Sequence, residues 1–477
     1  MVKRFAVALG TLCCLLGAAG PIRADEPSNA GLKAEIEVLK ERLSKLEAKV
    51  KEAPVAAQPR AEKAGEAILR HHAVYEPKAE EVPALVWPVP GIYTVPSTKD
   101  LGTLTGISWL SGTKIRGWVD TNYVMNFNHP DRTTVNANQG SSIVKGHNVS
   151  VEGRTFDIHD QSFNLSLAEV EIEKVPEIGG AGFKFDLAFG ETQDIIVDSI
   201  RGSLGPSAAA DSVTDFDKTF QHASVSYIAP IGRGLRFDAG KFVTHIGGET
   251  IETAKNWNYS HSFFYTYAIP FQDTGLHVSY PWSDTLYTDF YFLNGWNVTI
   301  DNNKGKTMGP SIGWTPLSWL SLCTNYLAGP EQADTGRNLK HIWDTQVFLG
   351  PFDRWNFMLN YDLGFEEKAA FGGNDGAHWN GITGYVRYKI NDWLEPSFRA
   401  EYYKDQDGVT TGMDQGLWGF TWTLNTKLGL GKNKASALLL RPELRYDRSS
   451  DKFFTKERRF RSKRDQWTLG AGATWLF

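Results

Sequence analysis

The feature that most constrains the fold of this sequence is a period-two alternation of apolar and polar residues, which begins near Ile115 and continues to Phe477. The pattern is clearest over residues 467–475, where Trp, Leu or Ala alternates with Thr or Gly. It recurs in earlier stretches such as 183–190 and 355–366. Because successive side chains of a β-strand point to opposite faces, the pattern predicts strands with one apolar and one polar face.

A soluble β-sandwich with one wet face would show the same alternation. Three features favour a transmembrane barrel instead. The apolar faces extend over about ten residues, the length that a tilted membrane strand requires. Short connections, such as 229–232 and 391–392, alternate with long polar connections at 128–160, 191–217, 246–270 and 447–465. Aromatic residues recur beside the short connections, where a membrane barrel carries its aromatic girdle, at Trp282, Trp319, Trp355 and Trp393.

The sequence therefore predicts an all-β protein, a transmembrane antiparallel barrel of about sixteen strands. The strands are expected near residues 115, 163, 183, 220, 235, 273, 285, 308, 319, 341, 354, 379, 393, 416, 436 and 466. Fourteen or eighteen strands are the alternatives, because the stretches near 163, 220 and 273 alternate less clearly. An even number places both ends of the barrel on the periplasmic side. After residue 24 no stretch of 18 residues is continuously apolar, which argues against a helical membrane protein.

Residues 1–24 have the composition of a cleaved secretory signal peptide. Lys3 and Arg4 precede an apolar run over residues 5–19, and Ala24 offers a cleavage site. The alternatives are an uncleaved anchor, for which the run is short, and a lipoprotein signal, which the residues before Cys14 disfavour. We therefore expect an exported protein of the cell outer membrane.

Cleavage after Ala24 would leave Cys323 as the only cysteine, so no intramolecular disulfide is expected. The formal net charge of −5 would become −8, because residues 1–24 contain three basic residues and no acidic one. Such an acidic protein is not expected to bind nucleic acid.

Residues 28–53 are predicted to form a short α-helical coiled coil ahead of the barrel. Apolar residues alternate four and three positions apart, as the a and d positions of heptads do; they are Leu32, Ile36, Leu39, Leu43, Leu46 and Val50. Because such a helix is marginal alone in water, we expect self-association, with a homotrimer as the favoured assembly. The alternative is one amphipathic helix packed on another part of the protein. Residues 54–114 are Pro-rich and form the predicted linker, which either crosses the periplasm or enters the barrel.

Several stretches between residues 115 and 477 resemble the OmpL-like porin family. They are Gly117-Trp118-Val119-Asp120-Thr121-Asn122-Tyr123 with Asn126-Phe127-Asn128-His129-Pro130, Phe183-Lys184-Phe185-Asp186-Leu187-Ala188-Phe189-Gly190, Asn256-Trp257-Asn258-Tyr259-Ser260, and Asn294-Gly295-Trp296-Asn297 followed by Asp301-Asn302-Asn303 and Lys306. The resemblance implies a barrel through which small solutes diffuse, and it carries no functional residues with it. The coiled coil and the linker lie outside it.

Charged residues occupy polar positions of several predicted strands, often with a basic and an acidic residue two positions apart. Such neighbours share one face, and a basic side chain that faced lipid near the midplane would cost about 2–4 kcal/mol, so the lumen is their expected place. The predicted pore-lining residues are Arg116, Asp120, Lys184, Asp186, Arg236, Asp238, Asp289, Arg399, Glu401 and Arg445. They either form a selectivity filter, for which rings of one sign are the strong arrangement, or merely neutralise one another in the wall. Inward aromatic residues either stack on sugars or pack against a constriction loop; they include Trp118, Tyr287, Tyr291 and Tyr403.

Two further features lie near the C-terminus. The loop 447–465 carries a basic cluster, defined here as Lys456, Arg458, Arg459, Arg461, Lys463 and Arg464. This cluster either attracts anions and binds lipopolysaccharide phosphates, or is a solvated outer loop. Phe477 ends the clearest strand and is predicted to act as an assembly signal for insertion into the membrane.

No cofactor or metal is expected, because the chain lacks a Gly-rich phosphate loop, a Gly-x-Ser-x-Gly elbow and a His-Glu-x-x-His motif. The leading hypothesis is passive diffusion of small hydrophilic solutes or ions through a porin, with outer-membrane lipid as its surroundings. One alternative is a structural anchor that tethers the envelope through the coiled coil. Another is a barrel enzyme, which would need Ser, His and a polar orienting group at one edge; we do not expect an enzyme.

Overall fold

The computed structural model describes residues 99–107, 110–130, 151–203, 213–370, 373, 375–430 and 436–477. The predicted signal peptide (1–24), the coiled coil (28–53) and most of the linker (54–114) lie outside the described residues. The described part of the linker contains β1 (Lys99–Asp100) and α4 (Leu101–Thr105), and β1 pairs with the first long strand.

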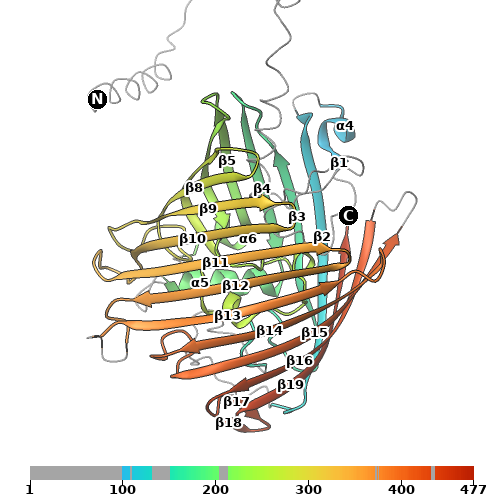
Figure 1. The fold of residues 1–477 in the computed structure, drawn as a ribbon, viewed down its shortest axis with the longest axis vertical. Helices are drawn as coiled ribbons and strands as arrows, with labels where there is room; N and C mark the ends of the chain where they lie inside the picture. Colours follow the sequence, from blue (N-terminus) through green and yellow to red (C-terminus); the bar gives the residue numbers. More distant parts are fainter. Residues whose placement is uncertain are drawn as a thin grey trace, which may run out of the picture. The chain divides into compact units, whose positions relative to one another are not determined.

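Sixteen antiparallel strands form a closed barrel, as the alternation predicts (Figure 1). The strands are β2 (Thr113–Asn126), β3 (Ser162–Lys174), β4 (Ala181–Phe189), β5 (Phe220–Ala229), β6 (Leu235–Val243), β7 (Gln272–Pro281), β8 (Leu286–Leu293), β9 (Thr307–Leu317), β10 (Leu320–Pro330), β11 (Leu339–Phe352), β12 (Trp355–Glu366), β13 (Ala377–Tyr388), β14 (Leu394–Asp405), β15 (Gln415–Leu430), β16 (Ser436–Ser449) and β19 (Asp465–Leu476). Each strand pairs with the next along the chain, and β19 pairs with β2 to close the ring. At this seam Gly117 and Phe477 exchange two backbone hydrogen bonds of 2.9 Å.

Along the strands, most outward side chains are apolar, and most inward side chains are polar, with some inward aromatic residues among them. On β12, for example, Leu359, Tyr361 and Leu363 are 41–45% exposed, whereas Asn360 and Asp362 between them are buried. The barrel thus exposes an apolar outer wall of the kind that faces lipid, and it keeps its polar residues for the interior.

The connections at the two ends of the barrel differ, as predicted. One end has short connections, for example residues 318–319 between β9 and β10 and residues 353–354 between β11 and β12. The predicted girdle residues Trp282, Trp319, Trp355 and Trp393 all lie beside short connections and are 40–59% exposed. This placement agrees with an interfacial girdle at the short-connection end.

The long connections contain structure that the polar composition did not predict. They hold α5 (Glu191–Ser203), α6 (Asp215–Thr219), the 3-10 helix η4 (Thr253–Lys255), α7 (Phe263–Tyr267) and a hairpin of β17 (Phe454–Lys456) and β18 (Arg459–Lys463). No helix among the described residues is both long enough and apolar enough to cross a membrane.

An apolar core inside the barrel explains why these connections fold. Residues 244–271, named here the inner loop, contribute Phe263, Phe264 and Phe271, which are at most 2% exposed. They pack with Ile195 and Ile196 of α5 and with buried side chains of the other long connections. Burial of these large side chains favours the inward position of the inner loop by roughly 1.5–3 kcal/mol for each one.

Candidate functional site

The inner loop is held against the barrel wall by hydrogen bonds to its backbone. The guanidinium of Arg399, on β14, donates to the carbonyl oxygens of Ser260 and His261 at 2.6 and 3.2 Å. It also donates to Glu249 Oε1 at 2.8 Å. Arg445, on β16, donates to the same carbonyl of His261 at 2.7 Å. Two buried arginines therefore hold the middle of the inner loop.

Carboxylates and amides of the wall hold the rest of the inner loop. Glu443 accepts hydrogen bonds from the backbone N–H groups of Tyr259 and Ser260 at 2.8 and 3.2 Å. Glu401 accepts from the Phe263 N–H at 2.6 Å, at the start of α7. Asn425 donates to the carbonyl of Trp257 at 3.0 Å. Residues 256–260, which resemble the OmpL-like family, are thus the part of the inner loop that the wall binds most closely.

All ten residues predicted to line the pore are buried inside the barrel, and they divide into two groups. The first group contacts the inner loop and consists of Asp120, Arg399, Glu401 and Arg445. Asp120, for example, accepts hydrogen bonds from Thr253 Oγ1 and Tyr259 Oη at 2.9 and 3.0 Å. These four side chains support the inner loop as well as the wall.

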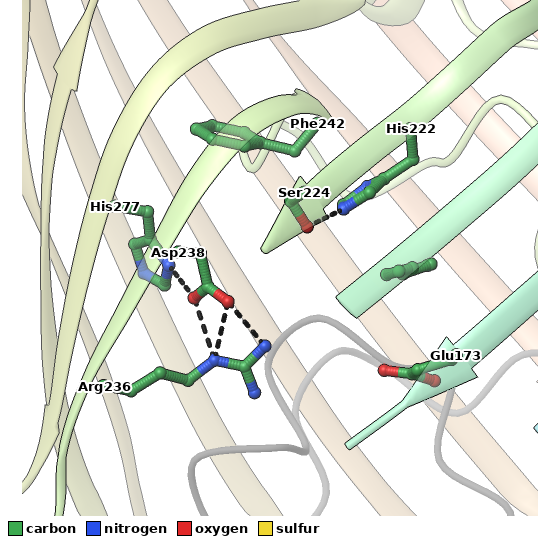
Figure 2. A pocket seen from close by; sticks show the side chains of 8 residues that line it. Glu173, His222, Ser224, Arg236, Asp238, Phe242 and His277 are labelled. Carbon is green, nitrogen blue, oxygen red and sulfur yellow. Dashed lines mark hydrogen bonds and ion pairs between the residues drawn. The ribbon is translucent and has the colours of Figure 1, made fainter. Parts of the chain in front are cut away.

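The second group consists of Arg116, Lys184, Asp186, Arg236, Asp238 and Asp289, on strands β2 to β8. Lys184 Nζ lies 3.5 Å from Glu171 and 3.3 Å from Asp186, and Arg116 pairs with the same glutamate. Arg236 binds Asp238, and His277 lies between Asp238 and Asp289 at 2.9 and 3.2 Å. Figure 2 shows Arg236, Asp238 and His277 pointing toward one another.

Five members of the second group, all except Arg116, line cavities inside the barrel. A cavity of about 130 Å³ lies between the inner loop and strands β4 to β11, and its lining includes Asp186, Glu249, Glu252, Asp289 and Lys255. A second cavity, of about 20 Å³, is lined by Glu173, Arg236 and Asp238 among others (Figure 2). The two cavities share Lys184, His222 and Phe242, so they adjoin.

The charge of the inner loop follows from its contacts. Burial raises the pKa of Glu249, but the Arg399 guanidinium and the Ser262 N–H outweigh it, and the pKa lies below its ordinary value. Burial likewise raises the pKa of Glu252, and Lys255 reverses the effect. Burial lowers the pKa of His245 to about 3. At neutral pH the inner loop therefore presents two charged carboxylates and a neutral imidazole beside the large cavity.

One group of carboxylates has the spacing of a metal site. Oxygen atoms of Glu169, Glu171 and Asp186 lie within 4.8 Å of one another. However, the ammonium of Lys184 already lies within 3.5 Å of two of these carboxylates, and that of Lys255 lies 4.0 Å from Glu171. The positive charge at this point is thus supplied by lysines, and the site fits a structural ion-pair cluster better than a resident metal.

The remaining predicted features lie as follows. Trp118, Tyr287, Tyr291 and Tyr403 are buried, and Tyr403 packs on Phe264 of the inner loop, as expected of residues beside a constriction loop. Residues of the basic cluster lie on and beside the β17–β18 hairpin. Lys456 and Arg461 are half-buried, and the exposed members are Arg458, Arg459, Lys463 and Arg464. Cys323 is a buried free thiol beside the large cavity.

The sequence alone did not indicate Glu249, Glu252 or Lys255, because the inner loop has no strand periodicity. For Glu443, by contrast, the sequence does contain a pattern that indicates an inward position. Arg441, Glu443, Arg445 and Asp447 occupy alternate positions of one strand, which is the same pattern that identified Arg399 with Glu401. Applied along the whole of β16, that pattern would have found Glu443.

Three solved structures resemble the fold at low sequence identity. An anion-selective porin from Comamonas acidovorans is 11% identical, with a TM-score of 0.45, over 76% of this chain and 99% of that chain. OprB from Pseudomonas putida is 11% identical, with a TM-score of 0.47, over 80% of this chain and 99% of that chain. OmpT, an outer membrane protein of Vibrio cholerae, is 11% identical, with a TM-score of 0.44, over 77% of this chain and 98% of that chain. No curated protein matches the sequence.

The sequence matches a protein-family model over the whole barrel. The family is described as "Putative beta-barrel porin-2, OmpL-like", and the match covers residues 112–477, from the first residue before β2 to Phe477. This range agrees with the resemblance seen in the motifs of the first strand and of the inner loop. The chain therefore belongs to the OmpL-like beta-barrel porin-2 family and is a protein of the outer membrane.

Proposed function

We propose that the protein is a channel through which small hydrophilic solutes or ions diffuse passively across the outer membrane. The observation that carries this proposal is the cavity of about 130 Å³ inside the closed barrel, beside the inner loop, whose lining includes charged side chains. A barrel that served only as an anchor would have no need of charged side chains around an open interior, because each of them costs desolvation free energy when buried.

The inner loop sets the width of the proposed channel. It occupies the side of the lumen next to β14, β15 and β16, where its backbone is hydrogen-bonded to the wall. The space that remains lies along β4 to β11 and is lined by Lys184, Asp186 and Asp289 of the predicted set. In this proposal some of the ten predicted residues line the passage, and others hold the inner loop, which forms the opposite side of the passage.

Single-channel conductance in planar bilayers tests the proposal. The purified barrel should first show native migration, running faster unheated than boiled on a detergent gel. It should then conduct in steps, and Ser311→Trp should lower the conductance, because Ser311 lines the large cavity and a Trp side chain would fill part of it. The control is Thr121→Trp, at an exposed outward position of β2. Heat-modifiable protein that never conducts would refute the channel and favour an anchor.

An enzymatic function has less support among the described residues. Ser224 Oγ lies 2.8 Å from His222 Nε2, but His222 Nδ1 has no hydrogen-bond partner. A serine nucleophile requires a third group that orients the histidine. We therefore do not extend the proposal to catalysis.

The proposed partners follow from the membrane location. The apolar outer wall binds outer-membrane lipid, and the basic cluster, with Arg458 and Arg459 exposed, suits the phosphates of lipopolysaccharide. A homotrimer held by residues 28–53 remains our proposal for the assembly. Cross-linking of the full chain tests it.

A further inference from the structure

The interior of the barrel has an excess of acidic side chains that the paired charges of the sequence did not reveal. Among the described residues, 21 Asp and Glu side chains are buried, against nine Lys and Arg side chains. The whole chain has a formal net charge of only −5. By this formal count, the buried side chains are more acidic than the protein as a whole.

The buried arginines are concentrated where the inner loop meets the wall. Arg399 and Arg445 bind carbonyl oxygens of Ser260 and His261. Arg441 donates to the carbonyl of Asn256 at 2.8 Å. None of these three arginines lines either cavity. These arginines hold the inner loop, and Arg399 also pairs with Glu249, one of the carboxylates of the large cavity.

The cavities retain the acidic excess. Six carboxylates line them, against three Lys or Arg side chains and His277, which lies between Asp238 and Asp289. The carboxylates are Glu173, Asp186, Asp238, Glu249, Glu252 and Asp289, and the basic residues are Lys184, Arg236 and Lys255. Carboxylates come from both sides of the large cavity, since Glu249 and Glu252 belong to the inner loop and Asp186 and Asp289 to the wall. The lining thus offers carboxylates on two sides, each with a basic side chain beside it, and carboxylates outnumber the basic groups that line the cavities.

One carboxylate oxygen has no protein partner. Asp186 is 1% exposed and lines the large cavity, and its Oδ1 atom accepts no hydrogen bond within the described structure. Its other oxygen lies 3.3 Å from Lys184 Nζ. A buried carboxylate oxygen without a donor is costly unless water or a cation approaches it.

We infer that the passage is selective for small cations and disfavours anions. This inference rests on the proposed channel function and names the class of solute that the channel carries. Low-dielectric walls with an excess of one sign focus the field into the opening between them, and walls of a single sign raise the local concentration of counter-ions by about tenfold or more. Carboxylates around a pore are the usual means of selecting cations.

The test is the reversal potential of the full-length wild-type protein in planar bilayers under a KCl gradient. The K⁺/Cl⁻ permeability ratio should be roughly ten or more at low salt and should fall as ionic strength rises, because salt screens the lining charges. A ratio at or below one would overturn the inference while leaving the channel in place. A complete absence of conductance would instead overturn the proposed function, and the inference with it.

Two variants locate the selectivity. Glu173→Gln with Asp186→Asn should lower the permeability ratio by about threefold, because two of the six lining carboxylates lose their charge. The matched control is Asp353→Asn, which removes one charge from an exposed turn and keeps a residue that tolerates its φ of 52°. An equal ratio in the double variant and the control would overturn the assignment of selectivity to these cavities. Should the double variant fail to assemble, the salt dependence of the wild-type ratio still decides the question.

Discussion

The attachment of the inner loop can be tested at Arg399. Its guanidinium is fully buried and donates to the carbonyls of Ser260 and His261 and to Glu249. Arg399→Gln replaces the fork of donors with a shorter, neutral amide. The variant loses all three hydrogen bonds from the Arg399 guanidinium to the inner loop, and the Glu249 carboxylate loses the positive charge that pairs with it.

The size of the effect follows from the burial of these groups. Hydrogen bonds to charged groups contribute about 1.5–3 kcal/mol each. Removing one partner of a buried ion pair costs about 3–5 kcal/mol, because the other charge stays buried without compensation. The two figures describe overlapping losses, so we expect about 3–5 kcal/mol less stabilisation of the docked loop. At about 1.4 kcal/mol per factor of ten, the population of the detached loop should rise by roughly 10²–10⁴-fold.

Limited proteolysis of the folded barrel gives the measurement. Trypsin should cleave the variant after Lys255, which the docked inner loop keeps largely buried with a side-chain exposure of 10%. Single-channel records of the variant should also show larger or noisier openings. Arg233→Gln is the control, since Arg233 pairs with Asp284 beside the short turns and not with the inner loop. Equal protection of Lys255 in the variant and the wild type would refute this account of the loop.

Three other predictions concern pH, closure of the barrel and assembly. Raising the pH from about 5 to about 8 should destabilise the packing of Glu152 against the β17–β18 hairpin, because burial raises the pKa of Glu152 to about 7 although the Thr455 N–H and hydroxyl, which donate to its carboxylate, lower it; the stabilisation is complete below the ordinary glutamate pKa and is lost as the pH rises to about 7. Hydrogen exchange of the β17–β18 hairpin should speed up over this range in the wild type, and an identical increase in Glu152→Gln would contradict the assignment. Deletion of Phe477 should lower the membrane yield of heat-modifiable barrel while synthesis and export continue, and a normal yield would show that the residue has no role in assembly. Leu39→Asp with Leu43→Asp should remove the cross-linked oligomer but keep the barrel monomer, and unchanged cross-linking would mean that the barrel walls hold the oligomer or that the helix docks elsewhere.

The strands could be predicted from the sequence because their pattern is local. Whether a side chain points inward or outward can be inferred from the residues one and two positions away, because successive side chains of a strand alternate between its faces. The stretch 467–475 alone therefore indicates which side of β19 faces lipid. Even the weakly alternating stretches near 163, 220 and 273 are strands in the structure. A closed barrel then follows, since a membrane sheet cannot leave edges unpaired.

The interior could not be predicted in the same way, because its contacts join distant segments. Arg399 meets Ser260 across 139 positions, and Glu443 meets Tyr259 across 184. No local pattern marks a carbonyl at Ser260 as the partner of an arginine on another strand. The charge pairs visible in the sequence, such as Lys184 with Asp186, suggested a balanced lumen. The acidic excess comes from both places: 15 of the 21 buried acidic side chains lie on strands, and six lie in the long connections, where no periodicity shows which side chains are enclosed.

The seam between β2 and β19 has a consequence for biogenesis. Thr474 Oγ1 donates to Asp120 Oδ1 at 2.6 Å, and 354 positions of the chain separate the two residues. The barrel can therefore close only after its sixteenth strand has been synthesised. Until then the sheet has two open edges, which attract other strands in water and leave unsatisfied amides in lipid. The entropic cost of closing so long a loop grows only slowly with its length, so the difficulty is one of rate. The unfinished barrel is stable neither in the periplasm nor in the bilayer. The chain must therefore be bound by other proteins while it crosses the periplasm, and it completes its barrel in the bilayer.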